Sequence, residues 1–417
     1  MAILKPKGTA DIFGKNAVLW QYVEAEIRRI CGLFAIGELR TPIFEYAELF
    51  KQSVGETTDI VQKEMYQFTD QGGRDYVLKP EGTAAAVRSY LESNMQNLPA
   101  PVKLYYISPI FRAERPQKGR YRQHHQFGAE FFGSYEAAAD AELISLAHFF
   151  LVETLGVTGL TLRLNSIGDK SCRTAYNAAL LEFLNSHKDK LCPLCLDRMK
   201  KNPMRVLDCK NEGCRAISVN APLPLDYISD DAMAHFVTLQ GHLNTLGIDF
   251  EIDKTIVRGL DYYTRTVFEF TSNDLGSQST VCGGGRYDYL IERNGGQPTG
   301  AVGFGMGIER LLIILEQQSK LPVVDESVQL FIGHIGEAGL AKAIEIAAKF
   351  RKNGVSAITD LANRSVKSQL KYADKLNAKF SVVVGDSELE SSKISIKNMQ
   401  TGESVETNFN DILEVLK

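Results

Sequence analysis

The chain has 417 residues, of which 44% are hydrophobic and 24% charged, as is ordinary for a globular protein of two or three domains. Its formal net charge of −4 excludes a protein that coats nucleic acid indiscriminately, so any RNA contact must come from local basic patches. No stretch approaches the roughly 20 apolar residues that span a bilayer, and the N-terminus has neither an apolar signal core nor a cleavage pattern, so we expect a cytoplasmic protein without membrane contact.

The N-terminal third begins with a predicted helix over Lys15–Ile36, where apolar residues recur at helical spacing. The helix ends near Gly37, and an extended run containing Pro42 follows. A hairpin is expected over Tyr66–Leu78, with its turn at two consecutive glycines, and Lys79–Thr83 leads into a second helix.

The segment Phe111–Glu130 predicts a strand, a basic loop and a returning strand. Only one acidic residue, Glu114, lies inside the loop, whose cations are Arg112, Arg115, Lys118, Arg120 and Arg122. A guanidinium fits phosphate better than an ammonium does because its planar fork donates two parallel hydrogen bonds. The loop therefore indicates a site for a polyphosphate or a nucleic-acid backbone.

The middle of the chain predicts more strands of the same sheet, over Leu160–Leu164, Thr255–Phe270 and Ser279–Cys282. A helix is expected over Ala139–Leu155, and residues from about 171 to 246 have the pattern of an inserted, mostly helical subdomain. Because successive strands are joined by hairpins, we expect an α+β architecture, a largely antiparallel sheet flanked by helices, and not a Rossmann fold.

The glycine-rich run Gly303–Arg310, GFGMGIER, opens an apolar helix, and its glycines allow a ligand to approach the backbone closely. After Pro322 the pattern changes to alternating strands and helices, which predicts a small α/β domain with parallel strands. Its expected strands are Val328–Ile335, Ser356–Thr359 and Phe380–Gly385, and its expected helices are Gly339–Lys352 and Ser365–Lys379.

The basic loop and the glycine-rich run resemble the second and third signature motifs of class II aminoacyl-tRNA synthetases. Val257–Thr266, VRGLDYYTRT, and Cys282–Asp288, CGGGRYD, resemble the histidine-binding signatures of the bacterial-type histidyl-tRNA synthetase family. Four ordered motifs are far more specific than any one of them. The resemblance covers essentially the whole chain and implies a class II catalytic domain over 1–322 and an anticodon-binding domain over 325–417.

The function implied by the resemblance is that of a histidine–tRNA ligase. Such an enzyme activates L-histidine with ATP and Mg²⁺ to histidyl-adenylate, releases diphosphate and transfers the histidyl group to tRNA(His). The alternative is a related non-catalytic, histidine-sensing regulatory subunit of ATP phosphoribosyltransferase, which should lack the anticodon-binding domain. Arg258, Arg310 and the additional C-terminal domain favour the ligase.

The resemblance also implies roles for cationic residues. Arg112 would contact the α-phosphate of ATP, Glu114 the adenine amino group and Arg310 the γ-phosphate end of a bent ATP, with Arg120 in the same ATP-binding set. Arg258 would lie between the substrate carboxylate and the α-phosphate, where other class II enzymes use a metal ion. Arg258, Arg112 and Arg310 are therefore the expected catalytic residues.

Histidine selection requires a pocket that pairs with an imidazole and with an amino acid's charged groups. By the same resemblance, Glu81, Thr83 and Gln126 suit the polar end of the amino acid, and Glu130 and Tyr263 suit the ring. A site whose buried polar groups demand partners strongly rejects isosteres that lack them.

Other aromatic groups of these motifs allow two interpretations. Tyr262 and Tyr287 either wall the histidine pocket or are ordinary aromatic core residues. The family loop more often has Glu-Phe where this chain has Gln123 and His124, and we interpret His124 and His125 as RNA-facing or loop-packing groups.

The chain has seven cysteines, and this odd number suits a reducing compartment. Four of them lie close together in the sequence: Cys192, Cys195, Cys209 and Cys214. Their number suits a four-thiolate zinc site, but only the first pair has a standard spacing and the family does not require zinc for catalysis. Four reduced structural cysteines remain the alternative.

Two further features of the sequence each allow two interpretations. The first helix and the strand with Pro42 resemble the first class II motif, which forms a dimer interface in the family. The resemblance implies a homodimer. An ordinary amphipathic helix packed on its own core explains the pattern equally well. In the C-terminal domain, cations at three- and four-residue steps form either an anticodon-stem contact or a solvated face: Arg364, Lys367, Lys371, Lys375 and Lys379.

Overall fold

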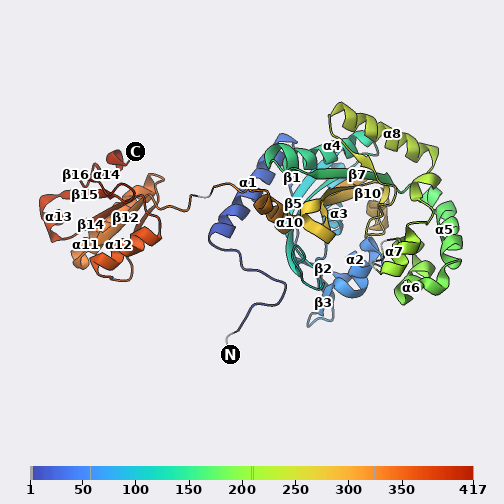
Figure 1. Ribbon diagram of the computed structural model, residues 1–417, viewed down its shortest axis with the longest axis horizontal. Helices are drawn as coiled ribbons and strands as arrows, with labels where there is room; N and C mark the ends of the chain where they lie inside the picture. Colours follow the sequence, from blue (N-terminus) through green and yellow to red (C-terminus); the bar gives the residue numbers. More distant parts are fainter. Residues whose placement is uncertain (1–2, 57, 208, 210, 324, 417) are drawn as a thin grey trace. The chain divides into compact units, whose positions relative to one another are not determined.

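The computed structural model describes residues 3–56, 58–207, 209, 211–323 and 325–416, apart from the side chains of 276–278. The chain forms two compact units, Met1–Pro322 and Val323–Lys417 (Figure 1). Among the described residues, no helix has the length and apolarity needed to cross a membrane.

An eight-stranded sheet forms the centre of the first unit, in the order β1-β5-β6-β11-β10-β9-β7-β8. Neighbouring strands from β5 to β7 in this order run antiparallel, and only the two short edge strands, β1 and β8, pair in parallel. The prediction of a largely antiparallel sheet is therefore confirmed. The strands are β1 (Gly37–Glu38), β5 (Val102–Phe111), β6 (Gln123–Phe132), β7 (Leu160–Ser166), β8 (Glu251–Ile252), β9 (Thr264–Ser272), β10 (Thr280–Arg286) and β11 (Ala301–Gly307).

The two faces of this sheet belong to two hydrophobic cores, because successive side chains of a strand point to opposite faces. Tyr105 and Phe131 lie in the first core, whereas their neighbours Tyr106 and Phe132 lie in the second. Helices of the first core are α1 (Lys15–Leu33), α4 (Ala137–His148), α8 (Asp230–Thr245) and α10 (Ile308–Gln317).

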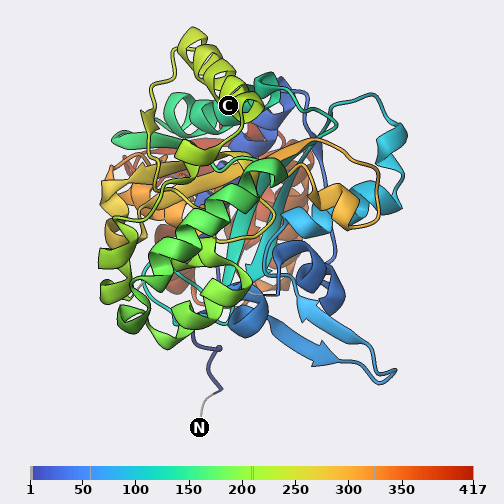
Figure 2. The ribbon, with the colours of Figure 1, turned by 90° about the vertical axis from the view of Figure 1, so that its right-hand side faces the viewer.

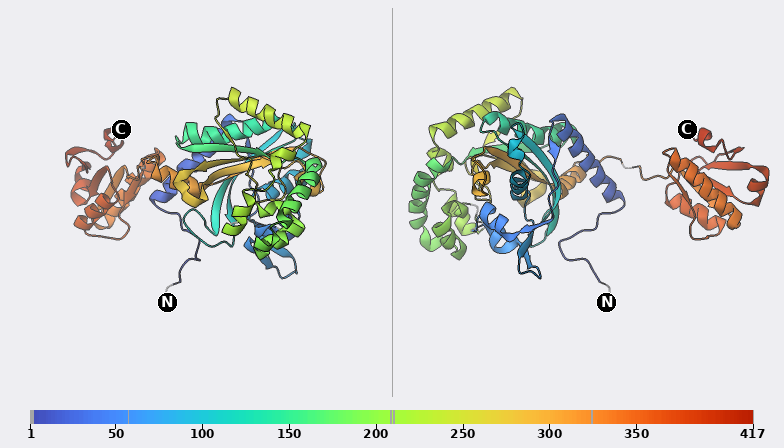
Figure 3. Two further views of the ribbon diagram at one scale, coloured as in Figure 1. Left: turned by 45° about the vertical axis from the view of Figure 1, so that its right-hand side comes forward. Right: turned by 180° about the vertical axis from the view of Figure 1, so that it is seen from behind.

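The second face is covered by helices that include the inserted segment. These are α3 (Thr83–Glu92), α5 (Lys170–Asn185), α6 (Pro193–Lys201), the 3-10 turn η5 (Pro203–Val206), α7 (Glu212–Ser218) and α9 (Leu290–Arg293). The inserted helices α5, α6 and α7 lie on the side of the unit away from α1 (Figure 3).

A separate three-stranded sheet, in the order β2-β4-β3, projects from this unit (Figure 2). It pairs β2 (Phe44–Tyr46) and β3 (Tyr66–Thr69) with β4 (Asp75–Leu78), and α2 (Ala47–Val54) follows β2. The predicted hairpin over Tyr66–Leu78 is thus confirmed.

Two sequence-based expectations need correction. Residues 255–263 form an irregular loop, and the strand that was expected to begin at Thr255 begins at Thr264. Tertiary contacts hold this loop instead of a ladder, since the Asn165 amide donates to the carbonyls of Lys254 and Ile256. The glycine run before Arg310 is the strand β11, and the helix starts only at Ile308.

The second unit has a five-stranded sheet in the order β13-β12-β14-β15-β16. Its parallel part matches the predicted alternation of strands and helices. This part consists of the strands β12 (Leu330–His334), β13 (Ala357–Thr359) and β14 (Phe380–Val384) and the helices α11 (Gly336–Lys352) and α12 (Val366–Lys375). The antiparallel hairpin of β15 (Lys393–Asn398) and β16 (Ser404–Asn408) was not predicted. Because α12 ends at Lys375, Arg364 and Lys379 lie outside the helix.

Candidate active site

A polar cavity of about 270 Å³ lies where the basic loop approaches β10, β11 and the start of α10. It brings together residues that are far apart in the sequence: Arg112, Glu114, Gly119, Arg120, Tyr121, His124, Gln126, Arg258, Thr280, Val281, Gly283, Gly305, Gly307, Glu309 and Arg310. All the residues expected to bind ATP line this arginine cavity, together with Arg258. Two loop cations, Arg115 and Lys118, are exposed and do not line it.

Backbone carbonyls fix the two expected phosphate-binding arginines. The Arg112 Nε donates to the Pro80 carbonyl at 2.8 Å, and the Arg310 guanidinium donates to the carbonyls of Gly119 at 2.9 Å and Thr280 at 2.8 Å. Burial lowers the pKa of Arg310, and the positive charges of Arg112 and Arg120 lower it further. A cavity that holds like charges together at this energetic cost is suited to a polyanion.

The cavity wall has further ionic and aromatic groups. Glu114 forms an ion pair with Arg120, and Glu309 accepts from the backbone and ring nitrogens of His125. His124, which we interpreted as an RNA-facing or loop-packing group, lines the cavity itself. Burial, then the charges of Arg112 and Arg310, lower the pKa of His124 to about 3, which keeps its imidazole neutral.

Arg258, in the irregular loop before β9, is one of the residues that line the arginine cavity. Its guanidinium forms an ion pair with Glu269 of β9 and lies 5.8 Å from the centroid of the Tyr263 ring. Burial alone would lower the pKa of Arg258, but the Glu269 carboxylate raises it overall. Glu269 also accepts from the Thr280 hydroxyl at 2.9 Å. The position of the Arg258 charge is therefore set by two neighbouring strands.

A second, enclosed polar group lies next to this arginine and is centred on Glu130. The Glu130 carboxylate is fully buried and accepts from Thr83 at 2.7 Å, from Tyr106 at 3.1 Å and from Tyr287. Burial raises its pKa to about 8, against the lowering effect of these donors. A buried carboxylate surrounded by hydroxyl donors is a recognition group for a polar ligand.

Glu81 and two tyrosines complete this group, which we call the Glu130 pocket. Glu81 accepts from the backbone nitrogens of Thr83 at 2.9 Å and Ala84 at 2.7 Å, and from the Tyr262 hydroxyl at 3.5 Å. Burial raises the pKa of Glu81. The Tyr262 ring lies 4.7 Å from Tyr263 and 5.5 Å from Tyr287. The tyrosines are thus core residues whose hydroxyls face carboxylates.

The alternating glycines of β11 make room for both sites. Gly303, Gly305 and Gly307 lie on one face of the strand; a Cβ at Gly303 would lie 1.6 Å from the Glu130 Oε2, and one at Gly305 would lie 2.1 Å from the Gln126 Nε2. Among the described residues, the buried Gln126 Oε1 has no hydrogen-bond partner, which suits a ligand donor.

Two residues of the site were missed by sequence reasoning. Tyr106 packs into the space left by Gly82 and Gly128, since a Cβ at either would lie 2.2 Å from its Cζ. Glu269 holds Arg258. The sequence did contain a signal for Glu269, because a carboxylate inside the apolar strand TVFEF needs a partner. Tyr106 carried no signal beyond strand alternation.

The sheet, the arginine cavity and the adjoining Glu130 pocket define the catalytic domain of a class II aminoacyl-tRNA synthetase. The family model for histidyl-tRNA synthetase matches residues 28–311, and the model for the anticodon-binding domain matches residues 328–417. The chain belongs to the histidyl-tRNA synthetase family.

Similar proteins cover the full length of the chain. A histidine–tRNA ligase of Acetivibrio thermocellus is 49% identical, and one of Caldanaerobacter subterraneus is 51% identical, each covering 99% of both chains. The crystal structure of apo S. aureus histidyl-tRNA synthetase has a TM-score of 0.84 and 36% identity over the whole of both chains. The predicted fold class and the aminoacyl-tRNA ligase class are confirmed, and the regulatory-subunit alternative is less supported.

Proposed function

We propose that the unit Met1–Pro322 forms histidyl-adenylate at the junction between the arginine cavity and the Glu130 pocket. One observation carries this proposal. Arg258 lines the arginine cavity and also lies 5.8 Å from the centroid of the Tyr263 ring, which contacts Tyr262 of the Glu130 pocket. A single fixed cation thus adjoins both the proposed nucleotide site and the proposed amino-acid site.

In this proposal the arginine cavity binds ATP. Arg112 contacts the α-phosphate and Arg310 the γ-phosphate end, while Glu114 accepts from the adenine amino group and Arg120 completes the set. Burial lowers the pKa of Arg310 most, and repulsion from Arg112 and Arg120 lowers it further; bound phosphate relieves that repulsion, which favours a bent polyphosphate lying across these cations.

Mg²⁺ is proposed to enter as part of the ATP substrate. The carboxylates that line the cavity, Glu114 and Glu309, are engaged with Arg120 and His125. A Mg²⁺ ion typically keeps several waters and binds through substrate phosphates with only one or two carboxylates. The wall arginines therefore supply most of the positive charge from the protein.

The Glu130 pocket is proposed to bind histidine. Glu130 and Tyr263 pair with the imidazole, and Tyr106, Tyr262 and Tyr287 surround it. Glu81, Thr83 and Gln126 hold the ammonium and carboxylate end. An analogue that lacks the imidazole nitrogens cannot pair with this buried carboxylate, which keeps only its three hydroxyl donors, so the site should favour histidine over such an analogue.

The chemistry follows from these positions. An oxygen of the histidine carboxylate attacks the α-phosphorus, the bond to the diphosphate breaks, and the electron pair leaves with diphosphate. Negative charge grows on the α-phosphate oxygens as the new bond forms. Arg258 and Arg112 stabilise this charge without reorganising, because Glu269 and the Pro80 carbonyl already hold them. A terminal tRNA ribose hydroxyl then attacks the adenylate carbonyl, the bond between that carbonyl carbon and the AMP oxygen breaks, and AMP leaves with the electron pair while the hydroxyl proton is released.

The unit Val323–Lys417 is proposed to bind the anticodon stem of tRNA(His). Lys367, Lys371 and Lys375 are exposed on α12, and no ion pair holds them within the part of the chain that the structure describes. By contrast, Arg364 pairs with Asp360 and Lys379 pairs with Asp325. The three unpaired lysines are the cations that remain available for phosphate.

A homodimer is also proposed. The inner face of α1 packs on its own core, as the ordinary interpretation requires, so α1 alone does not support an interface. The support comes from the projecting sheet, where Phe44, Tyr46 and Phe68 are about half exposed beside Tyr76. A contiguous exposed aromatic patch of this kind marks an interaction site. Sedimentation analysis should find twice the chain mass.

The deciding experiment is histidine-dependent exchange of pyrophosphate into ATP. A ligase catalyses this exchange without tRNA, whereas a histidine-sensing subunit binds histidine and shows none. Removing residues after Pro322 should preserve exchange and weaken tRNA charging, because only the second step needs the tRNA to be placed. Histidine binding without exchange by the full chain would refute the proposed function.

A further inference from the structure

Four cysteines converge on one point in the inserted segment. Cys192 is the N-cap of α6 and Cys195 lies in its first turn, Cys209 follows η5, and Cys214 lies at the start of α7. The backbone nitrogen of Cys195 donates to the Cys192 carbonyl at 2.9 Å, which forms a tight knuckle between the first pair. Three separate chain segments thus supply the four thiols.

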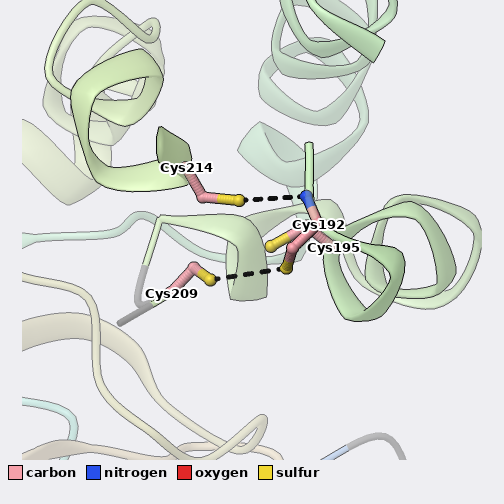
Figure 4. Close-up of side chains that lie close together, drawn as sticks. All are labelled: Cys192, Cys195, Cys209 and Cys214. Atoms are coloured by element: carbon pink, nitrogen blue, oxygen red, sulfur yellow. Dashed lines mark hydrogen bonds between the residues drawn. The ribbon is translucent and has the colours of Figure 1, made fainter. Parts of the chain in front are cut away.

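The geometry of the cluster suits a tetrahedral metal ion. The four sulfurs lie within 4.8 Å of one another, and no carboxylate or imidazole of the described residues joins them. Cys192 Sγ is 3.9 Å from Cys209 Sγ, and Cys214 Sγ accepts from the Cys192 backbone nitrogen at 3.3 Å (Figure 4). Thiolates bound to zinc at about 2.3 Å in a tetrahedron lie roughly 3.8 Å apart, so a small contraction completes the site.

The segment around the cluster is small, although its buried side chains join one of the two hydrophobic cores that pack on the central sheet of the unit. The segment consists of short elements, with nine residues in α6, four in η5 and seven in α7. It contains no strand among its described residues from 186 to 229. Small, loop-rich units of this kind are commonly stabilised by disulfides or a structural metal, and the four thiols are free.

The charge around the cluster is complementary to a metal-bound tetrathiolate. Four thiolates and one Zn²⁺ leave a net negative centre. Arg198, one turn after Cys195 on α6, is only 4% exposed and lies within electrostatic reach of Cys195 and Cys209. Its Nε has no hydrogen-bond partner among the described residues. Arg198 donates to the Asp59 carboxylate at 2.8 Å, and a negative zinc tetrathiolate would add a second, more buried counter-charge beside the same guanidinium.

The same helix end supports the loop that carries Arg258. The Asn202 amide, at the C-cap of α6, donates to the Asp261 carboxylate at 2.9 Å. Arg205 of η5 donates to the Arg258 carbonyl at 3.2 Å, and Arg198 donates to the Arg205 carbonyl at 3.1 Å. The cluster cysteines and the pocket tyrosines also belong to one continuous hydrophobic core.

We propose that Cys192, Cys195, Cys209 and Cys214 bind one structural Zn²⁺, and that this ion positions residues 258–263 for histidine binding through α6 and η5. The ion closes the chain around the cluster and fixes the end of α6. Asn202 and Arg205 then transmit that fixed position to the loop. The positioning part of this proposal rests on the proposed function, whereas the metal part does not.

The metal is tested on the purified full-length chain without reference to activity. Elemental analysis should find about one zinc per chain, and cobalt substitution should give the intense visible bands of a tetrahedral tetrathiolate. Cys195→Ser and Cys209→Ser should each lose the zinc, while Cys31→Ser, a buried cysteine in the other core, should keep it.

Three outcomes would overturn the metal site: no zinc in the wild-type chain, iron in its place, or zinc retained by both cluster variants as an adventitious ion only. If the cluster variants do not fold, the zinc content and cobalt spectrum of the wild-type chain decide the question alone.

The positioning role is tested with Asn202→Ala, which leaves every thiol in place. This variant should keep its zinc but raise KM for histidine about tenfold, because a hydrogen bond to a charged group is lost. KM for ATP should stay unchanged, because Arg112 and Arg310 are held by other elements. Chelator-treated wild-type protein should show the same selective change, and zinc should reverse it.

Equal changes in both KM values would reduce the zinc to a general stabiliser, and unchanged histidine KM in Asn202→Ala would refute the positioning. If the chain shows no exchange at all, titration calorimetry of histidine replaces KM, so failure of the proposed function is distinguishable from failure of this inference.

Discussion

Arg258→Ala removes the cation that joins the two proposed substrate sites. The structure predicts two separate consequences. The Glu269 carboxylate, 20% exposed, loses its ion-pair partner and retains only the Thr280 hydroxyl among the contacts described above. Loss of a charged hydrogen bond in such a position costs about 1.5 to 3 kcal/mol of folding stability.

The catalytic consequence should be larger. A positioned group that stabilises transition-state charge in an enclosed site typically contributes about 3 to 4 kcal/mol, so kcat for exchange should fall roughly 10²- to 10³-fold. KM for histidine should change little, since Glu130 and Glu81 keep their donors. The kcat of Arg258→Lys for exchange should lie between those of the wild type and Arg258→Ala, because an ammonium keeps the charge but not the planar fork.

The double variant Arg258→Ala with Glu269→Gln separates these effects. A neutral amide needs no cation and still accepts from Thr280, so thermal unfolding should show recovered stability. Pyrophosphate exchange should remain as slow as in Arg258→Ala. If the double variant regains exchange activity, the arginine acts only through folding, and the proposed role of Arg258 in catalysis is refuted.

Three further predictions concern other parts of the chain. Burial raises the pKa of Glu130 to about 8, so this group contributes folding stability that is present below its unfolded pKa and lost as pH rises through about 8. Glu130→Gln should flatten that loss of stability in unfolding measurements. The same variant should raise KM for histidine at least tenfold. An unchanged pH profile and KM would refute this account. Gly303→Ala should displace the Glu130 carboxylate and weaken histidine binding measured by calorimetry, whereas Gly241→Ala, in open space on a helix, should bind normally. Neutralising the three lysines of α12 should weaken tRNA affinity and flatten its salt dependence; equal salt slopes would make them a solvated face.

Local sequence patterns were enough to predict the family of this protein and several of its secondary-structure elements. The arginine-rich hairpin, the alternating glycines before Arg310 and the two histidine-type motifs carry residue types whose chemistry is local, so order and spacing along the chain were enough to predict the family. Periodicity likewise predicted the hairpin Tyr66–Leu78 and the alternating rhythm after Pro322.

The tertiary structure alone decided which of these groups meet. Glu130 faces Gly303 because of the β6–β11 register, and Tyr106 reaches Glu130 only because two glycines leave room. Residues 255–263 are a loop because distant side chains hold them, which no local periodicity encodes. The cysteine pattern predicted a possible metal ligand set, but the convergence of the four sulfurs depends on how α6, η5 and α7 pack. Long-range packing, not local propensity, sets those distances, since each contact joins segments far apart in the chain.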